Sequence, residues 1–148
     1  MKYLRLSAVA VSLALLPSCA KPPRAPEEAA TAASPEARIQ KIPPADPQKY
    51  AGLQDMKAWR NPYLIIRPDG VGLLDPANNE QHLLKPDELL DALAALPVTA
   101  WPYGRVVVLT ENSLTSSDEQ RVAIRRNKGI VAGTLESMHI LINWVPSA

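Results

Sequence analysis

The chain has 148 residues, a formal net charge of +1 and one cysteine. This length suits one domain, and the near-zero charge gives no electrostatic basis for binding nucleic acid. A single cysteine excludes an internal disulfide and a multi-cysteine metal site.

The first residues of the chain have the pattern of an export signal. Lys2 and Arg5 precede an uninterrupted run of apolar and small residues from Leu6 to Leu16, which is too short to span a membrane as a helix. The stretch Leu16-Pro17-Ser18-Cys19 resembles a bacterial lipobox. The resemblance implies a signal peptide over residues 1–18, lipidation of Cys19, and a location in the bacterial cell envelope, anchored to a membrane and facing the periplasm. It does not distinguish the inner from the outer membrane.

Two other interpretations of this segment stay open. Ordinary signal peptidase could cleave after Ala20, with Ser18 and Ala20 as the pair of small residues, and release a soluble protein. An uncleaved segment would remain as an anchor.

The next segment, from Ala20 to Asp46, is rich in proline and alanine and has no apolar period. Since proline interrupts helices, residues 19–46 are expected to be the lipidated cysteine and a disordered, semi-rigid tether. A short helix around Glu27 to Arg38 would be marginal by itself. Order is expected to begin near Pro47, and one small α/β domain is expected over residues 47–148.

The first half of this domain shows a helical turn, a hairpin and a helix. Apolar residues at three-residue steps indicate one or two helical turns before Asn61-Pro62. Residues 63–67 read as a strand, Pro68-Asp69-Gly70 as a turn and residues 71–74 as a returning strand. Residues 75–81 form a polar loop. A helix opens at Pro86 with acids in its first turn, and Pro97 ends it.

The second half shows a strand, a long helix and a last strand. The apolar run in residues 105–110 predicts a strand that is covered on both faces. Ser116 and Glu119 match a capping box, and the helix they open is expected to reach Met138. Residues 139–145 form the last strand. The apolar stripe predicted for the helix contains Ala123, Ile124, Ile130, Val131, Leu135 and Met138.

The order β-β-α-β-α-β predicts an α/β (α+β) domain, with a small single-layer sheet of about four strands and two helices packed on it.

Two envelope families resemble this order of elements. Residues 66–71, 85–89 and 106–109 are similar to the strand-turn-strand, helix start and central strand of the ExbD/TolR periplasmic domain, over roughly residues 63–145. Residues 107–140 are more loosely similar to an OmpA-like domain. The resemblances imply an envelope protein or peptidoglycan as partner. No ligand residue is carried over, because Thr110-Glu111 stands where that domain has a Thr-Asp pair.

Trp101, Tyr103 and Arg105 form a candidate interface before the predicted central strand. These residue types dominate binding hot spots. The alternative is that the two aromatic rings cover the end of a small core that contains no Phe.

Asn127 falls inside the apolar stripe of the long helix. A buried amide needs hydrogen-bond partners, so we expect Asn127 to tie the helix to a loop such as residues 101–104, as a structural residue. Arg121, Arg125 and Lys128 form a basic stripe on the opposite face. It is expected to be solvated, although it could bind an anionic glycan or lipid.

The sequence shows no catalytic constellation. His82 is expected in the polar loop and His139 at the start of the last strand, with no cysteine partner for a metal. The serines at positions 113, 116 and 117 lack a nearby histidine and are explained by turns and caps. We therefore expect no cofactor, no metal and a non-catalytic interaction or structural module. A small periplasmic enzyme with an unrecognised site is the alternative.

Overall fold

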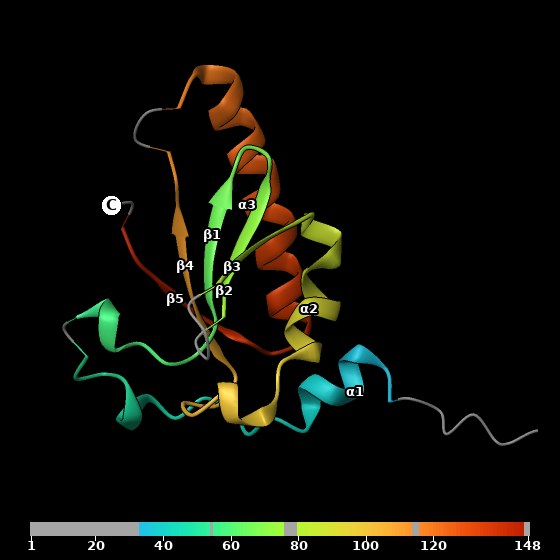
Figure 1. Ribbon diagram of the computed structural model, residues 1–148, viewed down its shortest axis with the longest axis vertical. Coiled ribbons are helices and arrows are strands. Elements are labelled where there is room, and N and C mark those ends of the chain that lie inside the picture. Colours follow the sequence, from blue (N-terminus) through green and yellow to red (C-terminus); the bar gives the residue numbers. More distant parts are fainter. Residues whose placement is uncertain (1–32, 54, 76–79, 114–115, 147–148) are drawn as a thin grey trace, which may run out of the picture. The chain divides into compact units, whose positions relative to one another are not determined.

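The computed structural model describes residues 33–53, 55–75, 80–113 and 116–146, which form an α+β unit (Figure 1). In this part of the chain a mixed sheet has the strand order β3-β2-β1-β4-β5. Four short 3-10 turns connect the elements: η1 (Pro47–Lys49), η2 (Met56–Ala58), η3 (Pro86–Glu88) and η4 (Val98–Ala100). The strands are β1 (Tyr63–Arg67), β2 (Gly70–Leu74), β3 (Gln81–Leu84), β4 (Val106–Glu111) and β5 (Leu141–Trp144), and the helices are α1 (Pro35–Gln40), α2 (Leu89–Ala95) and α3 (Asp118–Ser137).

The predicted hairpin is confirmed. β1 and β2 pair antiparallel, with Arg67 opposite Gly70. Arg67 donates two hydrogen bonds to the Asp69 carboxylate, at 3.0 and 3.2 Å, and this contact lowers the pKa of Asp69. Gly70 has φ +151°, and a Cβ there would lie 2.3 Å from the Leu84 carbonyl oxygen, so the turn accepts only glycine without strain.

The described part of the chain has a fifth strand where four were expected. Residues Gln81–Leu84 pair antiparallel with β2, so His82 lies on an edge strand and not in a loop. This strand has three exposed residues and one half-buried residue, so its sequence lacks the alternation that marks a strand. These residues form a strand because they pair with β2, and this pairing exists only in the folded chain.

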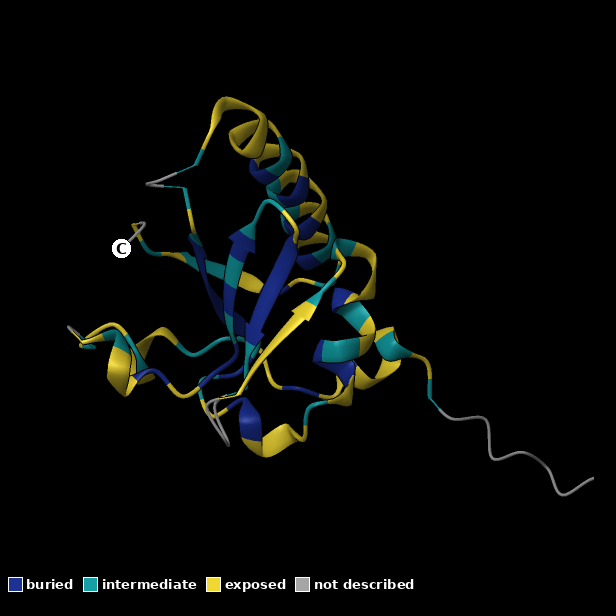
Figure 2. Ribbon diagram, turned by 45° about the horizontal axis from the view of Figure 1, so that its top comes forward, coloured by how far each residue is buried: buried dark blue, intermediate teal, exposed yellow. Residues whose placement is uncertain are grey.

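β4 is covered on both faces, as predicted. Val107 and Leu109 belong to the core under the helices, whereas Val106 and Val108 pack with Trp59 on the other face. The strand is buried from Val106 to Thr110 (Figure 2). β4 runs parallel to both β1 and β5. The second cover is the irregular segment between α1 and β1, and not a helix.

The long helix α3 begins one residue later than predicted. Ser117 is the N-cap, and it exchanges hydrogen bonds with Gln120 in a capping box. Its sheet-facing residues are Ile124, Asn127, Val131 and Leu135. Ile130, expected in the stripe, is 45% exposed. Ile130 and the buried Val131 are consecutive, so their side chains point about 100° apart around the helix axis. The buried face is therefore narrower than predicted.

The folded unit begins earlier than the predicted boundary at residue 47. Ser34 caps α1, with Pro35 in the first helical position, and the helix packs against α2. Ile39 and Ile42 are 0% and 3% exposed in the main core. Residues 34–46 are therefore part of the domain and not of a tether. Ile39 and Ile42 pack in the core against residues that lie far away in the sequence. Residues 1–32, which include Cys19, lie outside the described residues.

Within the described ranges, no helix has the length and apolar character needed to cross a membrane.

The role of α1 in the core can be tested with Ile39→Ala. This change should lower the free energy of unfolding by about 2–5 kcal/mol, because it leaves a cavity in a fully packed core. Thermal unfolding followed by circular dichroism measures the loss. Arg38→Ala, on the exposed side of the same helix, should stay within about 0.5 kcal/mol. Equal melting of the two variants would show that α1 does not belong to the core.

Candidate functional site

The loop from Trp101 to Arg105 packs against other parts of the same chain. Trp101 is 3% exposed and belongs to the main core, so the structure removes it from the predicted external interface. Tyr103 is half-buried, and its ring centroid lies 5.1 Å from that of Trp59 and 6.0 Å from that of Tyr50. Arg105 is half-buried and donates to the side chain of Gln40. These contacts support the alternative in which the aromatic residues cover the end of the core.

Backbone contacts fix the N-terminal segment across this loop. Asp46 N–H donates to the Tyr103 carbonyl, and Arg105 N–H donates to the Pro43 carbonyl, both at 2.9 Å. Between them, Gly104 has φ +77°, and a Cβ there would lie 2.1 Å from the carbonyl oxygen of Pro44. Only glycine lets the two backbones approach this closely.

Asn61 completes the junction between residues 43–46 and the loop at residues 101–105, a role that was not predicted from the sequence. Its amide nitrogen donates to the Gly104 and Val106 carbonyls, both at 2.7 Å, and its amide oxygen accepts from Tyr103 N–H at 2.9 Å. The side chain is 1% exposed, so all three bonds are protected from water. The only signal in the sequence is an asparagine directly before Pro62, which equally fits the end of a turn.

Asn127 performs a similar task at the other end of β1. It is 5% exposed, and its amide nitrogen donates to the carbonyls of Arg67 at 2.8 Å and Pro68 at 3.3 Å. The amide is buried and paired, as the helical stripe required. Its partner is the β1–β2 turn and not the predicted loop at residues 101–104, because α3 crosses the sheet above β1.

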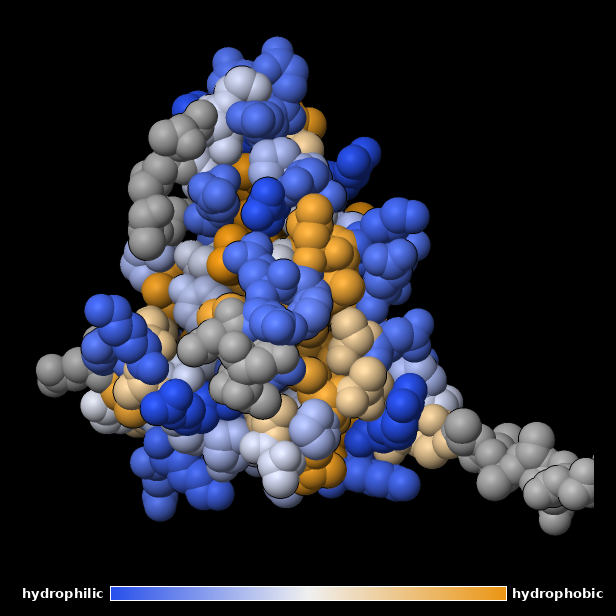
Figure 3. Space-filling model, in the orientation of Figure 1, coloured by the Kyte–Doolittle hydropathy of each residue, from blue (hydrophilic) through white to orange (hydrophobic). Residues whose placement is uncertain are grey.

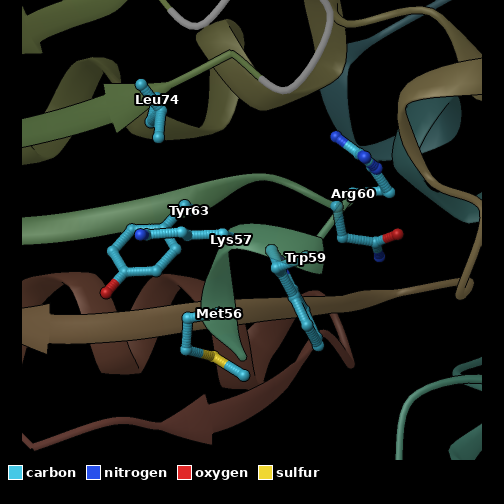
Figure 4. A pocket seen from close by; sticks show the side chains of 7 residues that line it. Met56, Lys57, Trp59, Arg60, Tyr63 and Leu74 are labelled. Carbon is cyan, nitrogen blue, oxygen red and sulfur yellow. The ribbon is translucent and has the colours of Figure 1, made fainter. Parts of the chain in front are cut away.

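A pocket of about 380 Å³ lies beside the junction, between the segment that carries η2 and the first two strands (Figure 4). Its volume is at the lower end of the range for small-molecule sites. Trp59 and Asn61 are buried, Met56, Tyr63 and Leu74 are half-buried, and Lys57 and Arg60 are exposed. The lining residues are Met56, Lys57, Trp59, Arg60, Asn61, Tyr63 and Leu74.

The polar groups of this pocket are mostly hydrogen-bond donors. Among the described residues, the Lys57 ammonium, the Arg60 guanidinium and the Tyr63 hydroxyl have no ion pair or hydrogen bond. The neighbouring Asp55 carboxylate accepts from the backbone N–H of Lys57 at 2.8 Å. Among the described residues that line the pocket, none carries a carboxylate. Lysine and arginine side chains only donate, so the site suits a ligand that is rich in acceptors.

The predicted basic stripe on α3 does not form one free surface. Arg121 pairs with Asp118 at 3.4 Å. Lys128 pairs with Glu111 and lies 4.5 Å from the centroid of the Trp144 ring. Two of the three cations are therefore partnered within the chain.

The other residues singled out from the sequence remain apart. His82 lies on the edge strand β3, and His139 lies just before β5 at the opposite edge, with φ +56°. Within the described ranges, no group of three or more His, Cys, Asp and Glu residues could hold a metal ion. Ser117 caps α3, and Ser116 donates to the Asn112 carbonyl.

Exposed apolar side chains are spread over separate elements. The large ones are Leu83, Val98, Val122, Ile130, Leu141 and Trp144. On the face shown in Figure 3, hydrophobic residues form a narrow strip bordered by hydrophilic ones. The pocket is therefore a better defined candidate site than any flat apolar surface on this face.

Comparison of the chain with known protein families, with curated proteins and with solved structures finds no match.

The two asparagine junctions can be tested together. Asn61→Ala removes the bonds of Asn61 to one N–H and two carbonyl groups, of which the Gly104 carbonyl still accepts from Val106 N–H, and Asn127→Ala removes the bonds of Asn127 to two carbonyls. Each change should cost about 1–3 kcal/mol or more in urea unfolding. Asn61→Asp should be worse than Asn61→Ala, because it turns a carboxylate toward two carbonyl oxygens. Asn127→Leu should not restore stability, since the carbonyls stay unpaired.

Arg125→Ala is the control for both sites, because Arg125 is exposed on α3. It should stay within about 0.5 kcal/mol of the unchanged protein. If the asparagine variants unfold like this control, the two amides do not hold the junctions.

Proposed function

We propose that this chain is a cell-envelope lipoprotein, anchored through Cys19, whose folded part is a non-catalytic interaction module. The anchor is inferred from the position of the only cysteine, which follows an apolar run and the small residue Ser18. An exported protein with one cysteine in this place has an acylation site rather than a disulfide partner. One acyl chain gives only marginal membrane binding, so stable anchoring needs more than one.

The chemistry of the pocket favours binding over catalysis. Acid–base catalysis needs a group that can accept a proton near neutral pH, most often histidine or a carboxylate. Its described lining contains instead two cations, a tyrosine hydroxyl, apolar side chains and the amide of Asn61, which is already hydrogen-bonded to the backbone. Such a lining can hold and orient a ligand, which is what an interaction module requires.

The early start of the folded unit shortens the reach of the anchor. The residues between Cys19 and Ser34 span at most on the order of 45 Å when fully extended, whereas a tether up to Asp46 would reach on the order of 80 Å. With the proposed anchor at Cys19, the folded module therefore lies within this distance of the membrane surface, and its partners must lie within the same range.

The anchor is tested by Cys19→Ser. This change should move the protein from the membrane to the soluble fraction and abolish labelling by a fatty-acid analogue, because the thiol that carries the acyl groups is gone. Ser18→Ala keeps a small residue before the cysteine and should leave both label and membrane retention intact. Membrane retention of Cys19→Ser without label would refute the lipid anchor. A wild-type protein that is already soluble would favour cleavage after Ala20.

A further inference from the structure

We infer that the pocket between η2 and the first two strands binds a ligand that combines an anionic group, phosphate or carboxylate, with an apolar body. The inference rests on the geometry and chemistry of the pocket. It deepens the proposed interaction function but does not depend on the lipid anchor.

The anionic part follows from the two uncompensated cations. Several cations of the domain are paired within it, among them Arg67 with Asp69, Arg121 with Asp118 and Lys128 with Glu111. Others, such as Arg38, Lys41 and Arg125, have no ion-pair partner among the described residues but are exposed and lie outside this pocket. Lys57 and Arg60 line the same pocket, and neither has an ion-pair partner among the described residues. The Arg60 guanidinium can bind a phosphate or carboxylate through two parallel hydrogen bonds, and Lys57 adds a point charge.

The apolar part follows from the other walls. Met56 and Leu74 are half-buried and line the pocket from the η2 turn and from β2. Figure 4 shows Lys57 and Tyr63 toward one side of the view, Leu74 on the neighbouring strand, and Arg60 toward the other side. A bare inorganic anion would leave these apolar surfaces in water, whereas a ligand with a short hydrocarbon or aromatic body would cover them.

The pocket is also held in shape by its surroundings. Trp59 packs edge-on against Tyr50, with centroids 5.6 Å apart, and its Nε1 donates to the Pro62 carbonyl at 3.4 Å. Asn61 holds the same segment to the start of β4 through its three hydrogen bonds. Because Arg60 lies between these two fixed residues and Lys57 lies two positions before Trp59, little backbone ordering is needed when a ligand binds.

The test titrates the full-length protein, purified in a neutral sugar detergent, with four small probes. Hexyl phosphate and hexanoate carry an anionic group and an apolar body, hexyltrimethylammonium has the body with a positive charge, and inorganic phosphate has no body. Nuclear magnetic resonance follows the indole N–H of Trp59 and the side-chain N–H of Arg60. We expect saturable shifts with at least one of the two anionic amphiphiles, weaker binding of inorganic phosphate, and none of the cation.

The variants separate the two parts of the ligand. The double change Lys57→Gln and Arg60→Gln should weaken binding of the anionic amphiphile by roughly twofold to thirtyfold, because exposed ion pairs contribute about 0.2–1 kcal/mol each. Leu74→Ala should weaken the amphiphile by roughly threefold or more and leave inorganic phosphate unchanged. The matched control is Arg38→Gln with Lys41→Gln, which removes the same charge from exposed positions outside the pocket and should not change binding.

The source of the anionic group is tested by short-chain lipids. Dihexanoyl phosphatidylglycerol that binds more tightly than hexanoate and hexyl phosphate would identify a membrane phospholipid, and the reverse order a soluble organic acid or phosphate ester. The inference is overturned if neither anionic amphiphile shifts the two signals, if the cation shifts them equally, or if the control variant loses as much affinity as the pocket variant. Thermal unfolding of each variant checks that the fold is intact. The Cys19→Ser fractionation is read separately, so either proposal can fail alone.

Discussion

The hydrogen bonds of Asn61 are the constraint on which this fold depends most. Asn61 precedes β1, and its amide bonds to the residues that precede and begin β4, the parallel neighbour of β1. Parallel neighbours cannot be joined by a tight turn, so their relative position must be set by contacts between distant residues. One buried side chain with three hydrogen bonds supplies such a contact at the point where both strands start.

The same junction explains why the two faces of the sheet differ. The helices α2 and α3 cover one face, and an irregular segment covers part of the other, held by backbone bonds from Pro43 and Asp46 to the loop before β4. Trp59, Tyr50 and Tyr103 form the aromatic cluster under this segment, in a chain without Phe. The pocket exists because the segment ends against the strands without covering the whole face. Structural support and ligand recognition therefore come from the same stretch of chain.

The residue types of the predicted interface fit two different structural roles. Trp, Tyr and Arg are frequent both at binding hot spots and at the ends of small cores, where a ring can be buried while its polar atom finds a partner. Tyr103 does this by donating from its hydroxyl to the Ala58 carbonyl at 3.2 Å. In the structure, Tyr103 and Arg105 contact the part of the same chain that precedes β1. This part also carries the two cations of the pocket.

The sequence alone determined the local features: the glycine turn of the hairpin, the buried character of β4, the long amphipathic helix and the polar residue in its buried face. These depend on residues within a few positions of each other, whose spacing shows in the sequence. The tertiary structure alone decided that Gln81–Leu84 is a strand, that Ile39 belongs to the core, and which loops Asn61 and Asn127 hold. Asn61 bonds to residues 42–45 positions away and Asn127 to residues 59–60 positions away. Contacts at such separations leave no periodic pattern, because they arise only when the sheet brings the segments together.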